Sequence, residues 1–200
     1  MIALGVLVSG GGTNLQAIID AIDAGELDAR IAMVVSSNPD AFGIERARRA
    51  GIDTLVMQVA DYADPAAADA RIADALKGAG VDYVAMAGYM RMVTPVLLDA
   101  FPNRVINLHP ALLPSFPGAH GIADAFDYGV KFTGITVHFA NAEMDAGPII
   151  AQRCVEVRES DTLDTLEARI HEAEHELYPQ VLQLVAQGRV AVEGRKVRIS

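Results

Sequence analysis

The chain alternates between short runs that are almost wholly apolar and longer stretches in which apolar residues recur every three to four positions. The apolar runs have the length of strands and cover residues 2–8, 31–36, 53–58, 82–88 and 104–108. The helix-patterned stretches lie near residues 14–24, 42–50, 66–79 and 95–101. Strands that are apolar on both sides are typical of sheets covered by helices on both faces. The pattern therefore predicts a doubly wound, mostly parallel α/β sheet.

The pattern changes after residue 108. A loop rich in proline and glycine extends to Gly118, and a short helix near 122–129 precedes strand-like runs at 133–139 and 148–157. We expect these two runs to add a hairpin-like, antiparallel C-terminal extension to the sheet. A long helix is predicted from Thr162 to about Val185, with a kink at Pro179, because proline lacks the N–H that a helix interior uses. No linker or repeat divides residues 1–200, which predicts a single domain.

Composition and charge narrow the class of protein. The 26 acidic and 16 basic residues give a net charge of -10, which argues against general attraction to nucleic acid or to an anionic membrane. The first apolar run follows no basic segment and is too short for a signal peptide or a membrane span. The only cysteine, Cys154, belongs to no cluster with the spacing of a zinc site. We therefore expect a cytoplasmic enzyme that acts on small molecules and contains no metal ion.

A glycine-rich turn, residues 9–14, follows the first apolar run and opens the first helix. Its backbone N–H groups and the positive end of the helix dipole could together hold an anion such as phosphate. The alternative is a tight turn capped by the side chains of Thr13 and Gln16, and the turn alone does not separate the two. NAD is disfavoured because Leu15 stands where a dinucleotide fingerprint needs glycine or alanine. The lysine of a Walker motif is also missing, which excludes NTP hydrolysis.

Asn107 and His109 stand at the carboxyl end of the apolar run 104–108, where open α/β sheets place their ligands. Two residues apart on a strand, their side chains point to the same face. An amide can donate to a developing oxyanion, and an imidazole can carry a proton to or from a departing nitrogen. The alternative is a strand-end amide and a histidine that bonds a loop carbonyl. Asp145, in a downstream turn, would favour the imidazolium and raise the pKa of His109 if it folded nearby.

A competing motif lies in the long helix. His171, Glu172 and His175 match H-E-x-x-H, which on a helix places two imidazoles on one side with a glutamate as general base for zinc hydrolysis. Such a short pattern arises readily by chance in a helix rich in glutamate and alanine. Beyond this helix, only Glu193 could serve as a third ligand. We therefore regard zinc chemistry as the weaker alternative.

Four segments together resemble one enzyme family. They are SGGGTNL at residues 9–15, GYMRM at 88–92, NLHPALLPSFPG at 107–118 and MDAGP at 144–148. The chain is similar over nearly its whole length to the phosphoribosylglycinamide formyltransferases. The resemblance implies formyl transfer from 10-formyltetrahydrofolate to glycinamide ribonucleotide in purine synthesis. It also implies a nucleotide-binding half, residues 1–103, and a half for catalysis and folate binding, residues 104–200, in a monomer or homodimer.

The same resemblance assigns roles to individual residues. Asn107 would stabilise the oxyanion, His109 would act as general acid toward the folate nitrogen, and Asp145 would support the protonated histidine. The remaining positions match ligand contacts: Gly12, Thr13, Asn14 and Glu174 for the ribonucleotide, and Met90, Arg91, Met92, Val93, Asn107 and Asn141 for the folate. One departure concerns the folate tail, because this chain has Pro65 near the position where relatives often carry an arginine. Arg71 could substitute, or the tail could be solvated.

Other formyl-handling enzymes share such a core and differ in what is attached to it. A deformylase would add an N-terminal regulatory domain, and a methionyl-tRNA formyltransferase would add a basic C-terminal domain. We expect neither here, because the first strand begins at residue 2 and only a short tail follows Val185. A non-catalytic sensor of nucleotide or folate is a further alternative, but sensing alone would not require Asn107, His109 and Asp145 together.

Overall fold

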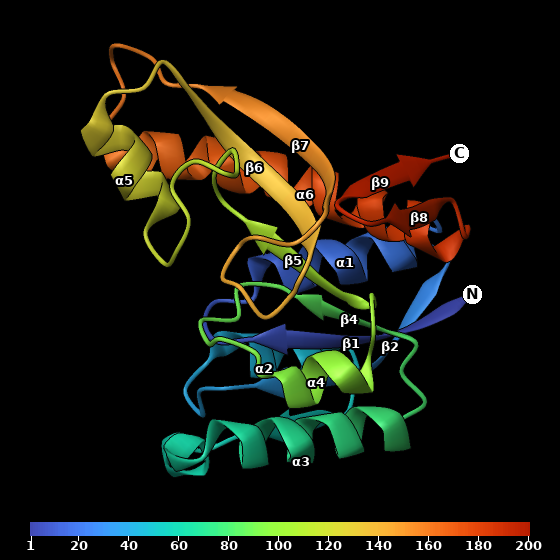
Figure 1. Ribbon diagram of the computed structural model, residues 1–200. Coiled ribbons are helices and arrows are strands. Elements are labelled where there is room, and N and C mark those ends of the chain that lie inside the picture. The colour runs from blue at the N-terminus through green and yellow to red at the C-terminus, as the bar shows by residue number, and fades with distance from the viewer.

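Seven strands form one sheet in the computed structural model, which describes residues 1–200 (Figure 1). The strand order is β3-β2-β1-β4-β5-β6-β7. Neighbours pair in parallel from β3 to β5, whereas β6 and β7 are antiparallel. The predicted sheet and its antiparallel extension are therefore confirmed. The strands are β1 (Ile2–Val8), β2 (Ala29–Ser36), β3 (Thr54–Val56), β4 (Tyr83–Met86), β5 (Val105–His109), β6 (Phe132–Phe139) and β7 (Ile149–Glu156).

Helices cover both faces of the sheet, as predicted. They are α1 (Thr13–Asp23), α2 (Phe42–Arg49), α3 (Pro65–Gly78), α4 (Pro95–Ala100), α5 (Gly121–Tyr128) and α6 (Leu163–Ala186). In Figure 1, α3 and α4 lie together on one side of the sheet, and α1 and α6 lie on the other. Each side has its own core of buried apolar residues, built mainly around α1 and α6 on one side and around α3 and α4 on the other. No helix is both long enough and apolar enough to cross a bilayer.

Helix α6 ends at Ala186 and contains Pro179, close to the predicted bounds. Two local features differ from the sequence-based expectation. Strand β3 is shorter than predicted because the chain turns into a 3-10 helix, η1 (Val59–Ala63). The residues expected to form only a tail instead build a separate antiparallel hairpin of β8 (Val190–Glu193) and β9 (Lys196–Ile199). Its alternation of apolar and polar residues around Gly194 is a hairpin pattern.

Tyr178 fixes α6 over the centre of the sheet. Its side chain is fully buried, and its hydroxyl lies 3.1 Å from the carbonyl of Met86 and 3.0 Å from that of Ile106. These two carbonyls belong to the neighbouring strands β4 and β5. Because Glu174 lies one helical turn before Tyr178, the same contact holds Glu174 near the carboxyl ends of the parallel strands.

Candidate active site

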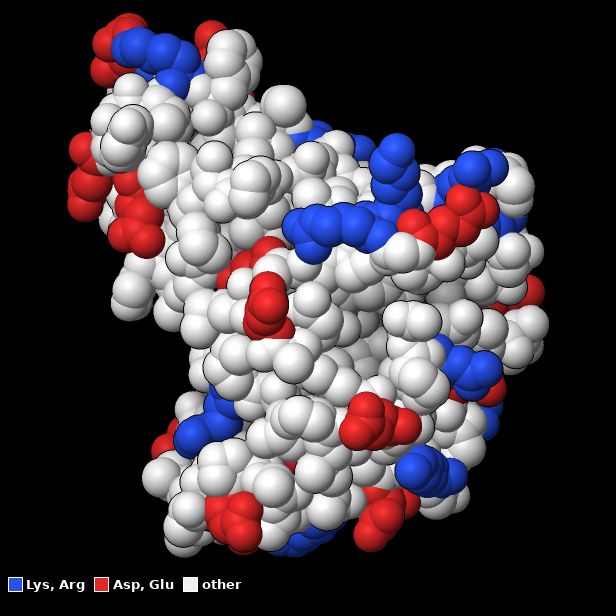
Figure 2. Space-filling model, in the orientation of Figure 1, with Lys and Arg blue, Asp and Glu red and all other residues white.

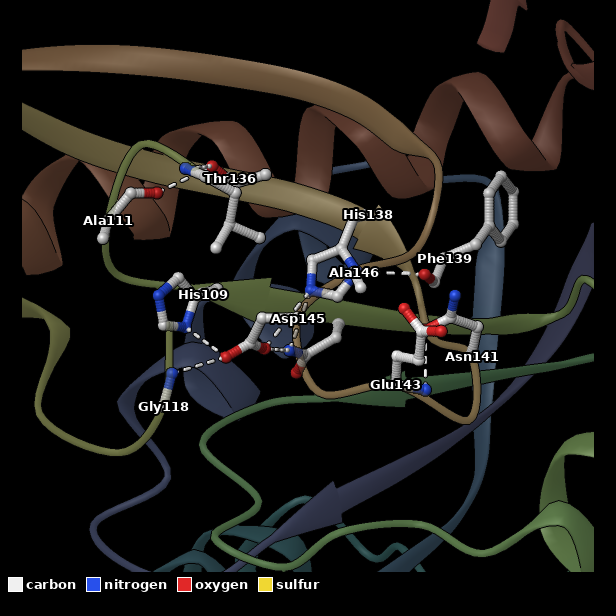
Figure 3. A network of polar contacts seen from close by, with 12 residues as sticks. His109, Ala111, Gly118, Thr136, His138, Phe139, Asn141, Glu143, Asp145 and Ala146 are labelled. Atoms are coloured by element: carbon white, nitrogen blue, oxygen red, sulfur yellow. Dashed lines mark hydrogen bonds and ion pairs between the residues drawn. The ribbon is translucent and has the colours of Figure 1, made fainter. Parts of the chain in front are cut away.

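The two predicted residues of β5 meet the predicted acid. Asp145 lies on the loop between β6 and β7, and Figure 3 shows its carboxylate beside the His109 ring. Asp145 Oδ2 is 3.5 Å from His109 Nδ1, and Asp145 Oδ1 accepts a hydrogen bond from Asn107 Nδ2 at 3.4 Å. The fold thus brings together three polar side chains that are up to 38 positions apart in the chain.

Asp145 is held as a carboxylate. Its Oδ2 atom accepts a hydrogen bond of 2.7 Å from the Gly118 N–H, and His138 Nε2 lies 3.7 Å from Oδ1. Burial by itself would raise the pKa of Asp145. The interactions with His138, with Gly118 and with His109 outweigh that effect and keep the pKa below its usual value. The site therefore has a negative charge at neutral pH.

His109 behaves differently from the sequence-based prediction. Its side chain is 4% exposed, and its Nε2 atom lies 2.8 Å from the carbonyl oxygen of Phe116. Burial lowers the pKa of His109, and this effect exceeds the opposing influence of Asp145 and Phe116. Asp145 acts in the predicted direction, but the predicted net rise in the pKa of His109 is wrong. Asp145 was placed correctly, but the loss of hydration around the ring was not visible in the sequence.

His138 is a further polar residue of this site. It is buried on β6, directly opposite Asn107 in the antiparallel pairing. Its Nδ1 atom lies 3.0 Å from the Phe139 carbonyl, so this nitrogen is a donor, and Nε2 can accept a hydrogen bond when the ring is neutral. Asn107 Nδ2 donates to that Nε2 at 3.1 Å. His138 thereby orients the Asn107 amide, a role that only the strand register reveals.

The glycine-rich turn lacks the side-chain cap that was its alternative reading. Gly12 occupies the N-cap of α1 with φ 69°, and no side chain bonds the first turn. The Gln16 side chain instead contacts Asp20 and Arg46. A Cβ atom on Gly12 would come within 2.6 Å of the Gly43 Cα atom, so the close approach of α2 also requires glycine. The N–H groups of the first turn are therefore free to bind a ligand.

Asn14 and Glu174 meet although 160 positions separate them. Asn14 Nδ2 donates to Glu174 Oε2 at 2.9 Å, and both residues are buried. Burial raises the pKa of Glu174, while the hydrogen bond from Asn14 works against that rise. The Asn14 Oδ1 atom is also buried and has no partner. The predicted ribonucleotide contacts on α1 and α6 thus lie in one place.

The H-E-x-x-H segment does not assemble a metal site. The rings of His171 and His175 stack with their centroids 6.5 Å apart, and no three histidine, cysteine or acidic side chains in the structure are grouped to hold a metal ion. His175 instead lines a groove of about 890 Å³ that runs between α1 and α6. Thr13 and Arg46 line the same groove, so its end adjoins the glycine-rich turn.

The predicted folate walls follow β4 at the same edge of the sheet. Met90 and Met92 are exposed, whereas Val93 packs into the core, so only its backbone remains available to a ligand. The Arg91 guanidinium lies 3.9 Å from the centre of the Tyr62 ring. Asn141 uses its side-chain oxygen to accept from the Glu143 N–H, as Figure 3 shows.

The region expected near the folate tail contains no free arginine. Pro65 is the first residue of α3, and Asp64 caps that helix through the N–H groups of Ala66 and Ala67. Arg71 Nη1 lies 3.4 Å from Asp61 Oδ2, so its charge already has a partner within the chain. Arg91 is a basic residue within the predicted folate walls.

Comparisons with known proteins agree with this geometry. A family model described as formyl transferase matches residues 3–182. The phosphoribosylglycinamide formyltransferase of Bacillus subtilis (strain 168) is 43% identical over 178 residues, which are 89% of this chain and 91% of that protein. The enzyme of the same name from Haemophilus influenzae is 38% identical over 190 residues, 95% of this chain and 90% of that protein.

A solved structure extends the similarity to the whole fold. Glycinamide ribonucleotide transformylase 1 from Symbiobacterium toebii superimposes with a TM-score of 0.97 at 52% identity, covering 100% of this chain and 94% of that one. Similarity of sequence and of fold therefore extends through the strand ends that hold Asn107, His109 and the glycine-rich turn. The chain belongs to the formyl transferase family and, within it, to the phosphoribosylglycinamide formyltransferases.

Proposed function

We propose that the chain transfers the formyl group of 10-formyltetrahydrofolate to the amine of glycinamide ribonucleotide. The products are the formylated ribonucleotide and tetrahydrofolate. The observation that carries this proposal is the convergence of Asn107, His109 and Asp145 at the carboxyl edge of the sheet. The glycine-rich turn and residues 90–93 follow β1 and β4 at the same edge. Donor and acceptor substrates would therefore meet there.

The reaction needs no nucleophile from the protein. The amine nitrogen of the ribonucleotide forms a bond to the formyl carbon, and the bond from that carbon to folate N10 breaks. One proton leaves the amine and one reaches N10, so protons balance within the site. Catalysis then depends on holding two substrates together and on stabilising the charge that develops on the formyl oxygen.

Each of the three side chains has a chemical task in this scheme. Asn107 would donate to the formyl oxygen the amide hydrogen that now faces Asp145 Oδ1, while its other hydrogen stays on His138 and keeps the amide oriented. His109 would protonate folate N10. Its Nε2 atom, which now bonds to the Phe116 carbonyl, must leave that carbonyl and contact the substrate instead. The Asp145 carboxylate would stabilise the imidazolium and help to remove the proton from the amine. The lowered pKa of Asp145 supports this role, because the group stays charged.

The ribonucleotide would bind across α1 and α6. The free N–H groups after Gly12, together with Thr13 and Asn14, would hold the phosphate, and Glu174 would contact the glycinamide end. Figure 2 shows acidic and basic side chains interspersed over one face of the molecule, without a continuous basic patch. In a chain of net charge -10, these local donors are what would attract an anion.

The folate would lie against residues 90–93 and the loop that carries Asp145. Exposed methionines at Met90, Met92 and Met144 are suited to the faces of an aromatic ring system. Arg91 and Asn141 would form hydrogen bonds with polar groups of the folate.

We further propose that the enzyme works without a metal ion, in the cytoplasm and as a monomer or homodimer. Its substrates would be small molecules and not nucleic acid. Residues 1–103 would supply most of the ribonucleotide site and residues 104–200 most of the catalytic site.

A direct assay tests this function. Purified protein is mixed with 10-formyltetrahydrofolate, with and without glycinamide ribonucleotide, while release of tetrahydrofolate is followed. We expect release only when the ribonucleotide is present. Equal release without it would indicate deformylation instead. Turnover that a chelator abolishes would contradict the metal-free scheme.

A further inference from the structure

The β8–β9 hairpin stands apart from the part of the chain that defines the family. It comprises residues 190–199, whereas the family model matches residues 3–182. The two strands pair only with each other, from Val190 with Ile199 to Glu193 with Lys196. Strand β9 contacts β7, and Val190, Val192 and Val197 pack against the main core. The hairpin is thus a small sheet docked on the catalytic half of the protein.

The tip of this hairpin reaches the catalytic loop. Arg195, in the two-residue turn with Gly194, donates through Nη1 to the carbonyl oxygen of Ala146. Ala146 directly follows Asp145. In Figure 1 the start of β9 lies beside β7, and Figure 2 shows basic and acidic side chains next to one another over the position of the hairpin. A side chain from the end of the sequence therefore contacts the residue next to the catalytic acid.

The catalytic loop requires support from outside. Asp145 has φ 51°, a left-handed conformation that persists in a non-glycine residue only where its surroundings hold it. Within the loop, the Ala146 N–H makes only a long hydrogen bond of 3.4 Å to Glu143. All other polar contacts of residues 140–148 come from the loop itself or from residues 105–139. Arg195 is the exception.

We propose that Arg195 is a positioning residue that fixes the peptide after Asp145 and so keeps the carboxylate facing His109. The inference assumes the role proposed for Asp145 in formyl transfer. The guanidinium is suited to this task because its donors lie in a rigid plane. Arg195 itself touches no reacting atom in this arrangement, so its effect is exerted through Asp145.

Two matched variants test the proposal. Arg195→Ala removes the contact with Ala146, whereas Arg198→Ala removes the 2.8 Å ion pair with Glu193 inside the same hairpin and leaves Arg195 in place. We expect Arg195→Ala to lower kcat by roughly 5- to 20-fold, because small displacements of a catalytic group are costly. The KM for glycinamide ribonucleotide should stay within about twofold, since Asn14 and Glu174 lie elsewhere. Arg198→Ala should retain the wild-type kcat.

Titration of His109, followed by NMR of its ring protons, distinguishes positioning from a loss of stability. His109 faces Asp145 and His138, and the Asp145 charge favours its protonated form. If Arg195→Ala lets Asp145 move away, the pKa of His109 will fall further, while Arg198→Ala will leave it unchanged. An unchanged kcat and titration in Arg195→Ala, or equal losses in both variants, would overturn the inference. If Asp145→Asn kept full activity, the role of Asp145 would fail instead, independently of these results.

Discussion

The His109 ring lies between two acceptors, with Nδ1 3.5 Å from the Asp145 carboxylate and Nε2 2.8 Å from the Phe116 carbonyl. A neutral imidazole has a single N–H and can satisfy only one of them, whereas the imidazolium can satisfy both. Burial opposes that charge and lowers the pKa of His109. Hydrogen-bonding geometry thus favours the proton and desolvation disfavours it, a balance that suits a group which must both release and regain a proton.

Removing the side chain of either His109 or Asp145 should abolish most of the turnover. We expect His109→Ala and Asp145→Ala each to lower kcat by at least about 100-fold, as is typical for groups that move protons. Steady-state assays with both substrates measure the effect. Glu143→Ala is the matched control, because Glu143 is an exposed acid in the same loop whose side chain has no partner there. Near-normal turnover in His109→Ala or Asp145→Ala would refute the role of that residue.

His138 should matter although it is not expected to touch the substrate. His138→Phe removes the acceptor of the Asn107 amide while keeping an aromatic ring in the buried position. We predict a loss in kcat of roughly 10- to 100-fold, since a donor to an oxyanion loses its value when its orientation is free. Circular dichroism should show a native fold. Wild-type kcat in a folded His138→Phe protein would show that Asn107 needs no such support.

The buried histidine should make folding stability depend on pH. Because the pKa of His109 is lower in the folded state, the unfolded chain binds the proton more readily. The stability of the protein should therefore fall as the pH drops through the ordinary histidine range, near about 6.5. Urea unfolding between about pH 7.5 and 5.5 measures this dependence. His109→Gln should show a shallower decline, and an identical slope in both proteins would contradict the assignment.

The Glu174 carboxylate should bind the substrate at the expense of folding stability. Burial raises its pKa, so the folded state disfavours the charged form, and the stability that depends on protonation is lost as the pH rises through the folded pKa. Glu174→Gln keeps an acceptor for Asn14 without the charge. We expect a gain on the order of 1 kcal/mol at neutral pH that disappears in acid, with a higher KM for the ribonucleotide. A less stable Glu174→Gln protein at neutral pH would contradict this prediction.

A side chain at Gly12 should damage the turn that is proposed to hold phosphate. Gly12→Ala forces a Cβ atom into a position with φ 69° and within 2.6 Å of Gly43. We expect a loss of about 1–3 kcal/mol in stability and a marked rise in the KM for the ribonucleotide, with the KM for the folate little changed. Gly25→Ala, another positive-φ glycine with open space around it, controls for the backbone effect. Equal KM changes in both variants would argue against a phosphate site.

Much of the fold follows from local patterns in the sequence. The apolar runs and helical periods predicted the parallel sheet and its antiparallel extension. A strand that is buried on both faces carries few polar residues, so it is visible in the sequence as an apolar run. The carboxyl ends of β1, β4 and β5 share one edge in any such sheet. The glycine-rich turn, Met90 and Asn107 must therefore lie along that edge. The resemblance to a known family gave Asp145 its role and added Glu174, and no local pattern connects either residue to that edge.

Tertiary structure decided what depends on contacts between distant residues. The pKa of His109 falls because the surrounding chain excludes water from its ring. The presence of Asp145 in the sequence does not reveal that exclusion. The role of His138 depends on the register of β5 against β6, and that of Arg195 on where the final hairpin docks. Residue identity determines which groups can donate, accept or carry charge. Packing determines their partners and their hydration, and hence which of those chemical abilities each group retains.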